Sequence, residues 1–355
     1  MNVRPRAASF LCFFVVSSPG FSQQTAPPSP EGRHLTLQVA VTDSSGKPVH
    51  GLTEGDFSVF DNSRPLEITN WRPPTNPSSV RGNVPSKEPP IKVILVIDEV
   101  NSNFRRVAYE RLDLEKFLTQ NGGRLAFPLS KVFYGNNGME VRDSSSLDGK
   151  AWLAVLDQHL TPLRAVNKTG GLAGEVERFR FGINSLSFLA TKQAQVPGRK
   201  IVIWISPGWP LLSDPRIDVS SKTENELFTL IVSLSTALRQ AQISLYNVEH
   251  LDDSDGIRLL YLYREFLKPV TVPKQALPGN LALQVLAEQS GGLVINSSHG
   301  LDSMINQCIE DASATYSIAV DLPPADKPDD YHNLEVKPAK PGLTARTRKG
   351  YYVQP

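Results

Sequence analysis

The segment Lys92 to Ser102, KVILVIDEVNS, restricts the fold of this 355-residue chain more than any other segment. It is a short run of mostly β-branched apolar residues that ends in the carboxylate of Asp98, followed by small polar side chains. A run of this length is typical of a strand buried on both faces, as in parallel sheets covered by helices. Ligands bind to open α/β sheets at the loops that follow the strand ends. The sequence therefore predicts that Asp98 lies at the carboxyl edge of a central strand.

From Ile91 onward, strand patterns alternate with helix patterns. Strands are predicted at Lys92–Ile97, Leu125–Tyr134, Ile201–Ile205, Ile243–Val248, Leu293–Ile295 and Tyr316–Val320. Helices are predicted near residues 106–119, 150–159, 176–193, 224–241, 281–289 and 301–313. This alternation implies right-handed crossovers and a mainly parallel sheet. The predicted fold class is α/β: a doubly wound, mainly parallel, Rossmann-like sheet in a three-layer α/β/α arrangement.

The N-terminal residues are typical of an exported protein. Arg4 and Arg6 precede the apolar run Ala7 to Val16, and small residues follow it, so residues 1–22 are predicted to be a signal peptide. The run is too short to span a bilayer. Residues 23–33 are predicted to be a flexible tether. The protein is therefore expected in the periplasm or outside the cell, with no membrane span once the signal peptide is removed.

Two further regions carry strand patterns. Residues 34–72 alternate polar and apolar side chains between turn residues, which predicts a small β unit. Residues 73–90 contain six prolines and are predicted to be a linker to the α/β domain of residues 91–321. Residues 322–355 return to strand patterns. Because isolated pairs of strands are marginally stable, this C-terminal β segment is expected to pack with the N-terminal β unit.

Composition and motifs exclude several functions. The formal net charge is +1 and there is no basic block, so no nucleic-acid partner is expected. The chain lacks the H-E-x-x-H, G-x-S-x-G and glycine-rich nucleotide patterns. A hydrolase that uses Ser206 or His250 remains an alternative, because Ser206 follows a predicted strand and His250 precedes two aspartates. Without a defined spacing between such groups, the chain is not expected to be an enzyme.

Several motifs, in order, resemble the VWFA-related domain family of acidobacterial type, whose members are similar to von Willebrand factor A domains. The resemblance covers residues 35–354 and rests on GLTEGDFSVFDN, VILVIDEVNS, PGRKIVIWISPGWP, ISLYNVEH, LAEQSGGLV and PGLTARTRKGYY. It implies a secreted, non-catalytic binding module with a VWFA-like α/β domain and a short β segment. The expected function is protein–protein interaction or adhesion, with a protein or surface macromolecule as partner. A structural role in an envelope or secretion assembly is the alternative.

The same resemblance implies a reduced metal-ion-dependent adhesion site. In the family pattern D-x-S-x-S, Asp98 and Ser102 match and Val100 departs, while Thr169 is the candidate for the threonine of a second loop. These residues would provide oxygen ligands to Mg²⁺ or Mn²⁺. The aspartate usual in the third loop is replaced by the sequence SPG, so no cofactor is certain. The alternative is that the Asp98 carboxylate caps its own loop by accepting backbone N–H groups.

Other residues are predicted to follow strand ends at the same edge. Asn101 adjoins the Asp98 motif, and Trp209 lies in a proline-stiffened loop as a candidate aromatic anchor. Asp214 follows in that loop, while Asp253 and Asp255 follow the strand Ile243–Val248. Together these residues form the predicted partner-binding edge.

Overall fold

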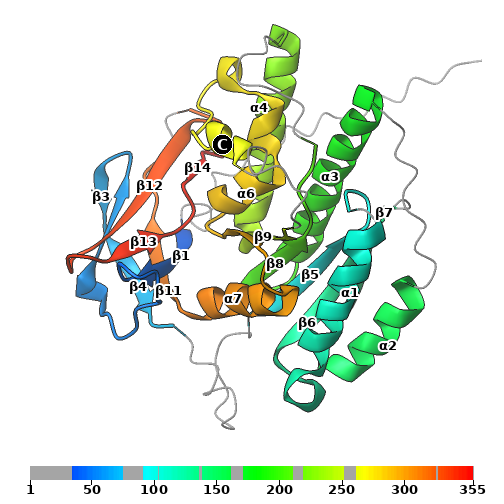
Figure 1. The fold of residues 1–355 in the computed structure, drawn as a ribbon. Helices are drawn as coiled ribbons and strands as arrows, with labels where there is room; N and C mark the ends of the chain where they lie inside the picture. The colour runs from blue at the N-terminus through cyan, green and yellow to red at the C-terminus, as the bar shows by residue number, and fades with distance from the viewer. Residues whose placement is uncertain are drawn as a thin grey trace, which may run out of the picture. The chain divides into compact units, whose positions relative to one another are not determined.

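The computed structural model describes residues 34–74, 91–102, 104–135, 138–160, 171–210, 219–251, 261–324 and 327–354 (Figure 1). The predicted signal peptide and tether, and most of the predicted linker, lie outside these ranges.

A six-stranded sheet occupies the centre of the described α/β region. Its strand order is β10-β9-β8-β5-β6-β7. The strands are β5 (Lys92–Asp98), β6 (Arg124–Gly135), β7 (Gly138–Asp148), β8 (Lys200–Ile205), β9 (Ile243–His250) and β10 (Val294–Ser297). The pairs among the first five are parallel, whereas β7 runs antiparallel to β6. Because β5 has a partner on each side and is buried on both faces, it is almost entirely apolar up to Asp98.

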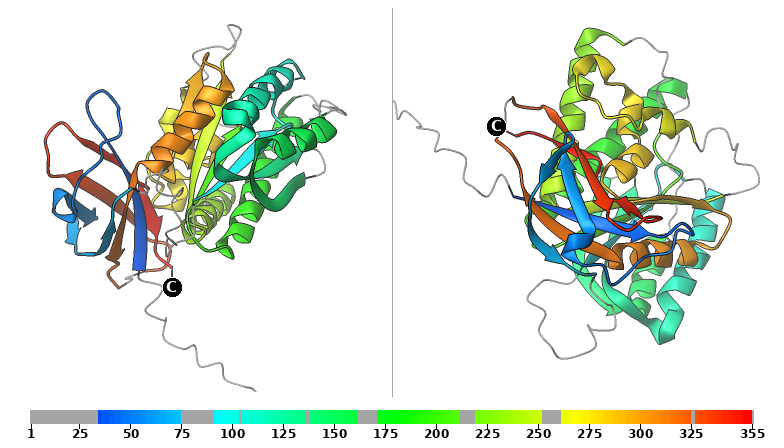
Figure 2. Two further views of the ribbon diagram at one scale, coloured as in Figure 1. Left: turned by 90° about the horizontal axis from the view of Figure 1, so that it is seen from below. Right: turned by 90° about the vertical axis from the view of Figure 1, so that its left-hand side faces the viewer.

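Helices cover both faces of this sheet (Figures 1 and 2). The α-helices are α1 (Phe104–Thr119), α2 (Gly149–Leu160), α3 (Gly171–Ala194), α4 (Ser221–Gln240), α6 (Leu283–Gln289) and α7 (Leu301–Ser313). Apolar residues of α3, α4 and α6 pack on one face and those of α1, α2 and α7 on the other. Short 3-10 helices are η2 (Glu54–Asp56), η4 (Gln120–Gly123), η5 (Leu262–Phe266), η6 (Pro273–Gln275) and η7 (Pro278–Leu281). Within the described ranges, no helix combines the length and the apolar character needed to cross a bilayer.

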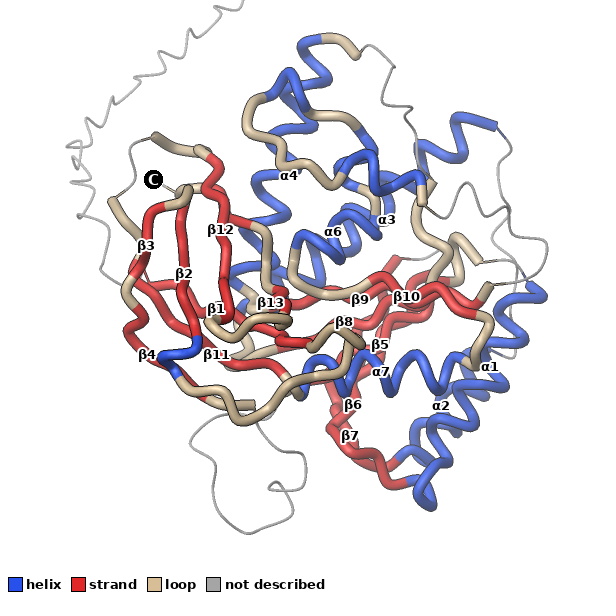
Figure 3. Tube along the Cα trace, turned by 60° about the vertical axis from the view of Figure 1, so that its left-hand side comes forward, coloured by secondary structure: helices blue, strands red, loops and turns tan. Residues whose placement is uncertain are grey.

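The remaining strands form two antiparallel sheets that face each other (Figure 3). One has the order β13-β1-β11-β4 and contains β1 (His34–Thr42), β4 (Ile68–Arg72), β11 (Thr315–Asp321) and β13 (Thr344–Arg346). The other has the order β14-β12-β2-β3 and contains β2 (Phe57–Asp61), β3 (Arg64–Leu66), β12 (Tyr331–Pro338) and β14 (Gly350–Tyr352). Apolar side chains of both sheets share one hydrophobic core. We call these two sheets the β sandwich.

The predicted fold class, a doubly wound and mainly parallel three-layer sheet with a small β unit, is wrong for this chain. The central sheet is mixed because of β7, and eight strands outside it form the β sandwich. The predicted strand Tyr316–Val320 is part of β11, which pairs antiparallel with β1 and β4 in the β sandwich. A run of apolar residues is compatible with a parallel or an antiparallel partner, so its sequence could not assign it to a sheet. The strand β7 was missed because its residues are mostly polar.

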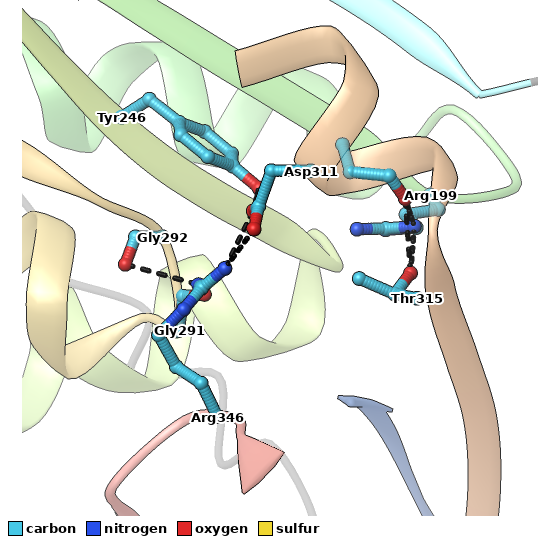
Figure 4. Close-up of polar contacts among 8 residues, drawn as sticks. Arg199, Tyr246, Gly291, Gly292, Asp311, Thr315 and Arg346 are labelled. Carbon is cyan, nitrogen blue, oxygen red and sulfur yellow. Dashed lines mark hydrogen bonds and ion pairs between the residues drawn. The ribbon is translucent and has the colours of Figure 1, made fainter. Parts of the chain in front are cut away.

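An arginine of the β sandwich connects it to the helices of the α/β region (Figure 4). Arg346, at the end of β13, places Nη2 2.5 Å from Asp311 Oδ1 on α7. Its Nη1 donates to the carbonyl oxygens of Gly291 and Gly292, the latter at 3.1 Å. Tyr246 of β9 donates its hydroxyl to the same Asp311 carboxylate at 2.7 Å. This charge pair is largely buried and joins three elements that are distant in sequence.

Candidate binding edge at the carboxyl ends of the parallel strands

Asp98 ends β5, and its side chain is 0% exposed. Oδ1 accepts the backbone N–H groups of Val100 and Asn101, each at 2.9 Å. Oδ2 accepts the Ser206 hydroxyl at 2.6 Å, the Trp204 indole N–H at 3.3 Å and the Asn101 side-chain amide at 3.0 Å. Both carboxylate oxygens are therefore engaged by donors of the protein. The carboxylate connects the loop after β5 to the neighbouring strand β8.

Further carboxyl groups lie around this loop, and we call Asp98, Glu99, Glu110 and Glu249 the acidic cluster. Burial raises the pKa of Asp98, although hydrogen bonds from Ser206 and Asn101 oppose the rise. Burial raises the pKa of Glu99 to about 7, with a further contribution from Asp98. Glu249 forms an ion pair with Arg106 of α1. Arg106 Nη1 lies 2.9 Å from Glu249 Oε1.

Glu110, on α1, is a buried member of the acidic cluster. Burial raises its pKa to about 8, Arg106 opposes this rise, and the charges of Asp98 and Glu249 add to it. At neutral pH the Glu110 carboxyl group is therefore mainly protonated. Protonation of Glu110 removes part of the charge repulsion within the acidic cluster.

The residues predicted to hold Mg²⁺ or Mn²⁺ do not fit a cation at Asp98. A hard cation needs lone pairs of oxygen ligands, and the lone pairs of the Asp98 carboxylate are already used by N–H and O–H donors. Among the described residues, no group of three or more His, Cys, Asp or Glu side chains has a metal-binding arrangement. Thr169 lies outside the described residues. Ser102 is buried, and its hydroxyl has no hydrogen-bond partner within the described part of the chain.

Trp209 is not the exposed anchor that its loop suggested. It is 4% exposed, and its ring lies edge-on to that of Trp204 with 5.5 Å between centroids. It also packs against Gly182 of α3, so closely that a Cβ atom at that glycine would lie 2.6 Å from the indole. Trp209 therefore belongs to the hydrophobic core. Asp214, Asp253 and Asp255 lie outside the described residues, and Asn101 is half-buried in the Asp98 loop.

The residues of the hydrolase alternative do not form a nucleophile–base pair. Ser206 is buried; its hydroxyl donates to Asp98 and accepts the backbone N–H of Gly208 at 3.0 Å. The Nδ1 atom of His250 lies 3.3 Å from the carbonyl oxygen of His299. In the described ranges, no hydrogen bond joins Ser206 to His250. Ser206 and His250 are therefore not paired within the described part of the chain, as the hydrolase alternative requires.

Two exposed apolar residues beside the acidic cluster were not singled out from the sequence. Tyr109 is 59% exposed and Leu112 is 56% exposed, and they lie three residues apart on α1. The buried face of this helix is formed by Leu114, Phe117 and Leu118. A helical wheel of the predicted helix places Tyr109 and Leu112 off that face. This is the sequence signal that could have identified them.

Comparisons with known proteins give little further information. No family model matches the chain, and no curated protein matches it. Among solved structures, the pilus adhesin SpaC from Lactobacillus rhamnosus GG aligns with a TM-score of 0.38 and 11% sequence identity. The alignment covers 86% of this chain and 49% of the adhesin, so the chain spans about half of that adhesin's length. A match of this size establishes neither a shared fold nor a shared function, and the family resemblance remains a prediction.

Proposed function

We propose that this chain is an exported, non-catalytic binding protein that engages another protein through the outer face of α1, beside the carboxyl edge of the parallel strands. The observation that carries the proposal is the pair Tyr109 and Leu112, both more than half exposed and close together on one helix. Tyrosine is enriched among the residues that dominate binding energy at protein interfaces. An aromatic and an aliphatic side chain at this spacing form a compact apolar contact surface.

Hydrogen bonds and an ion pair connect the elements beside this surface. Asp98 accepts the backbone N–H groups of Val100 and Asn101 after β5, and the ion pair between Arg106 and Glu249 joins the first turn of α1 to the end of β9. Arg106 is only 11% exposed, so this ion pair is poorly screened by solvent. A surface that is ordered before binding loses less conformational entropy when the partner binds. In this proposal, the acidic cluster supports the binding surface and needs no cation.

The proposal is tested by capture from the envelope fraction of the cells that produce the protein. Wild-type protein, the double variant Tyr109→Ser with Leu112→Ser, and the control Phe188→Ser are immobilised at equal density. Phe188 is 46% exposed on α3 and lies outside the proposed surface. We expect the wild type and the control to retain the same saturable partner and the double variant to lose it. Equal retention by all three proteins would contradict the proposal.

A further inference from the structure

A polar hollow lies between the β sandwich and the α/β region, at the end of β9 opposite to the acidic cluster. The hollow is partly open to solvent. The lining comes from β1, the end of α4, the start of β9, the turn after α6 and the segment between β13 and β14. Its polar lining residues are Thr36, Gln38, Arg239, Gln242, Ser244, Ser290, Thr347 and Arg348. No carboxylate is among them.

Two arginines define the electrostatics of this hollow. Burial lowers the pKa of Arg348 to about 10, and the second cause is the neighbouring charge of Arg239. Burial also lowers the pKa of Arg239. Both guanidinium groups nevertheless stay protonated at neutral pH. The hollow therefore carries two positive charges that repel each other.

Neither arginine is neutralised within the described part of the chain. No ion pair of Arg239 or Arg348 with a carboxylate is present there, and the hydroxyls that influence their pKa values belong to the uncharged Tyr351 and Tyr331. Two nearby lining atoms, Arg239 Nε and Thr347 Oγ1, are buried without a hydrogen-bond partner among the described residues. Buried polar groups and charges are costly unless they are paired. Among the described residues, the hollow thus offers the two guanidinium groups no negatively charged acceptor.

We propose that this hollow binds a small tetrahedral oxyanion of the phosphate or sulfate type, held by Arg239, Arg348 and the hydroxyl of Thr347. A guanidinium group offers parallel N–H donors that match two oxygens of such an anion. Two guanidinium groups and a hydroxyl supply enough donors for several of its oxygens. Because Arg239 lies in the last turn of α4 and Arg348 precedes β14, the bound anion bridges the β sandwich and the α/β region.

The site is independent of the proposed protein-binding surface. Ser244, which lines the hollow, is the second residue of β9, whereas Glu249 of the acidic cluster lies near its other end. Loss of anion binding therefore leaves the α1 surface unchanged, and serine substitutions at Tyr109 and Leu112 leave anion binding unchanged.

The test uses thermal unfolding of the full chain, with sodium chloride replaced by sodium phosphate or sulfate at constant ionic strength. We compare the wild type with Arg239→Gln, Arg348→Gln and the control Arg180→Gln, which removes one exposed charge from α3. Phosphate and sulfate stabilise most proteins by exclusion from their surface, so a non-specific rise in Tm is common to all four proteins. We expect an additional saturable rise in the wild type and in Arg180→Gln that is absent from the other two variants.

Direct titration with inorganic phosphate, followed by calorimetry, gives the affinity of each folded variant. Binding should weaken about tenfold or more when either lining arginine is lost, because a charge-assisted hydrogen bond is removed. Arg348→Lys keeps the charge but not the paired donors and should bind with intermediate affinity. A parallel titration with glycerol 3-phosphate distinguishes a site for the free ion from one for a phosphate ester. Absence of saturable binding to the wild type, or equal affinity in all variants, would overturn the proposal.

Discussion

At the scale of single residues, Asp98 illustrates how one carboxylate can organise a loop. Removing this group from water is costly. Part of the cost is offset because its two oxygens accept hydrogen bonds from two backbone N–H groups and three side chains. Its position after a buried strand was predictable from the run KVILVID. The full set of hydrogen bonds to its carboxylate was not predictable, because two donors, Trp204 of β8 and Ser206 just after β8, are more than a hundred residues away in sequence.

The engagement of Asp98 leads to a prediction about divalent cations. Millimolar Mg²⁺ or Mn²⁺ should leave the Tm of the wild type unchanged, because no lone pair of the carboxylate is open for coordination. Thermal unfolding with each metal, at matched ionic strength, measures this. A saturable rise in Tm that disappears in Ser102→Ala would show that the loop rearranges to hold a cation, contrary to the prediction.

A second prediction at this scale concerns Glu110 and pH. Its pKa is raised from 4.5 in the unfolded chain to about 8 in the fold, so the folded state binds more protons between these values. The free energy of unfolding therefore falls as the pH rises through this window, by on the order of 2 to 4 kcal/mol for this group. Glu110→Gln removes this contribution.

We expect Glu110→Gln to gain stability relative to the wild type as the pH rises from about 5 to about 8.5. Urea unfolding at several pH values measures the difference. Part of the pH dependence should remain in the variant, because burial also raises the pKa values of Asp98 and Glu99. A constant difference between the two proteins at all pH values would contradict the assignment.

At the scale of elements, the helices were predicted better than the sheets. The helix expected near residues 301–313 is α7, Leu301–Ser313, because its apolar residues follow the period of a helix and are buried as one face. Sheet membership depends on partners elsewhere in the chain. The sequence of β11 therefore predicted a strand but not its place in the β sandwich, and the polar strand β7 was not predicted at all.

The contact between α3 and the loop after β8 gives a prediction at this scale. In Gly182→Ala, the new Cβ would lie within 3 Å of three Trp209 ring atoms, so the helix and the indole must move apart. We expect a loss of about 1 to 3 kcal/mol from overpacking, despite the higher helix propensity of alanine. Gly55→Ala is the control, since no heavy atom lies within 4 Å of the position that its new Cβ would take. Equal stability of both variants in urea would contradict the close packing of Trp209.

At the scale of the whole described chain, buried charges join the β sandwich to the α/β region. Arg346 of β13 forms an ion pair with Asp311 of α7 (Figure 4). The nearby Arg199 donates to Thr315 at the start of β11 and to the carbonyl oxygen of Ala312, the latter at 2.6 Å. Such groups are costly to leave unpaired. In the described structure these groups are paired across the boundary between the β sandwich and the α/β region.

The corresponding prediction concerns Asp311→Ala. The substitution leaves the Arg346 guanidinium group buried without its counter-charge and the Tyr246 hydroxyl without its acceptor. We expect a loss of about 3 to 5 kcal/mol in the free energy of unfolding. Asp321→Ala removes an exposed partner of His34 and should change stability by less than about 1 kcal/mol. Similar urea midpoints for the two variants would show that the buried pair contributes little.

The sequence by itself determined the local structure of this protein. Apolar periodicity identified most helices and the buried strands, and the end of KVILVID placed Asp98 at a strand terminus, because these features depend on neighbouring residues. The tertiary structure alone decided that β11 joins the β sandwich, that Trp209 is buried and that Asp98 is saturated by hydrogen bonds. It also brought Arg239 and Arg348 to one hollow. These outcomes depend on contacts between residues that are far apart in the chain, and a local sequence pattern does not predict such contacts.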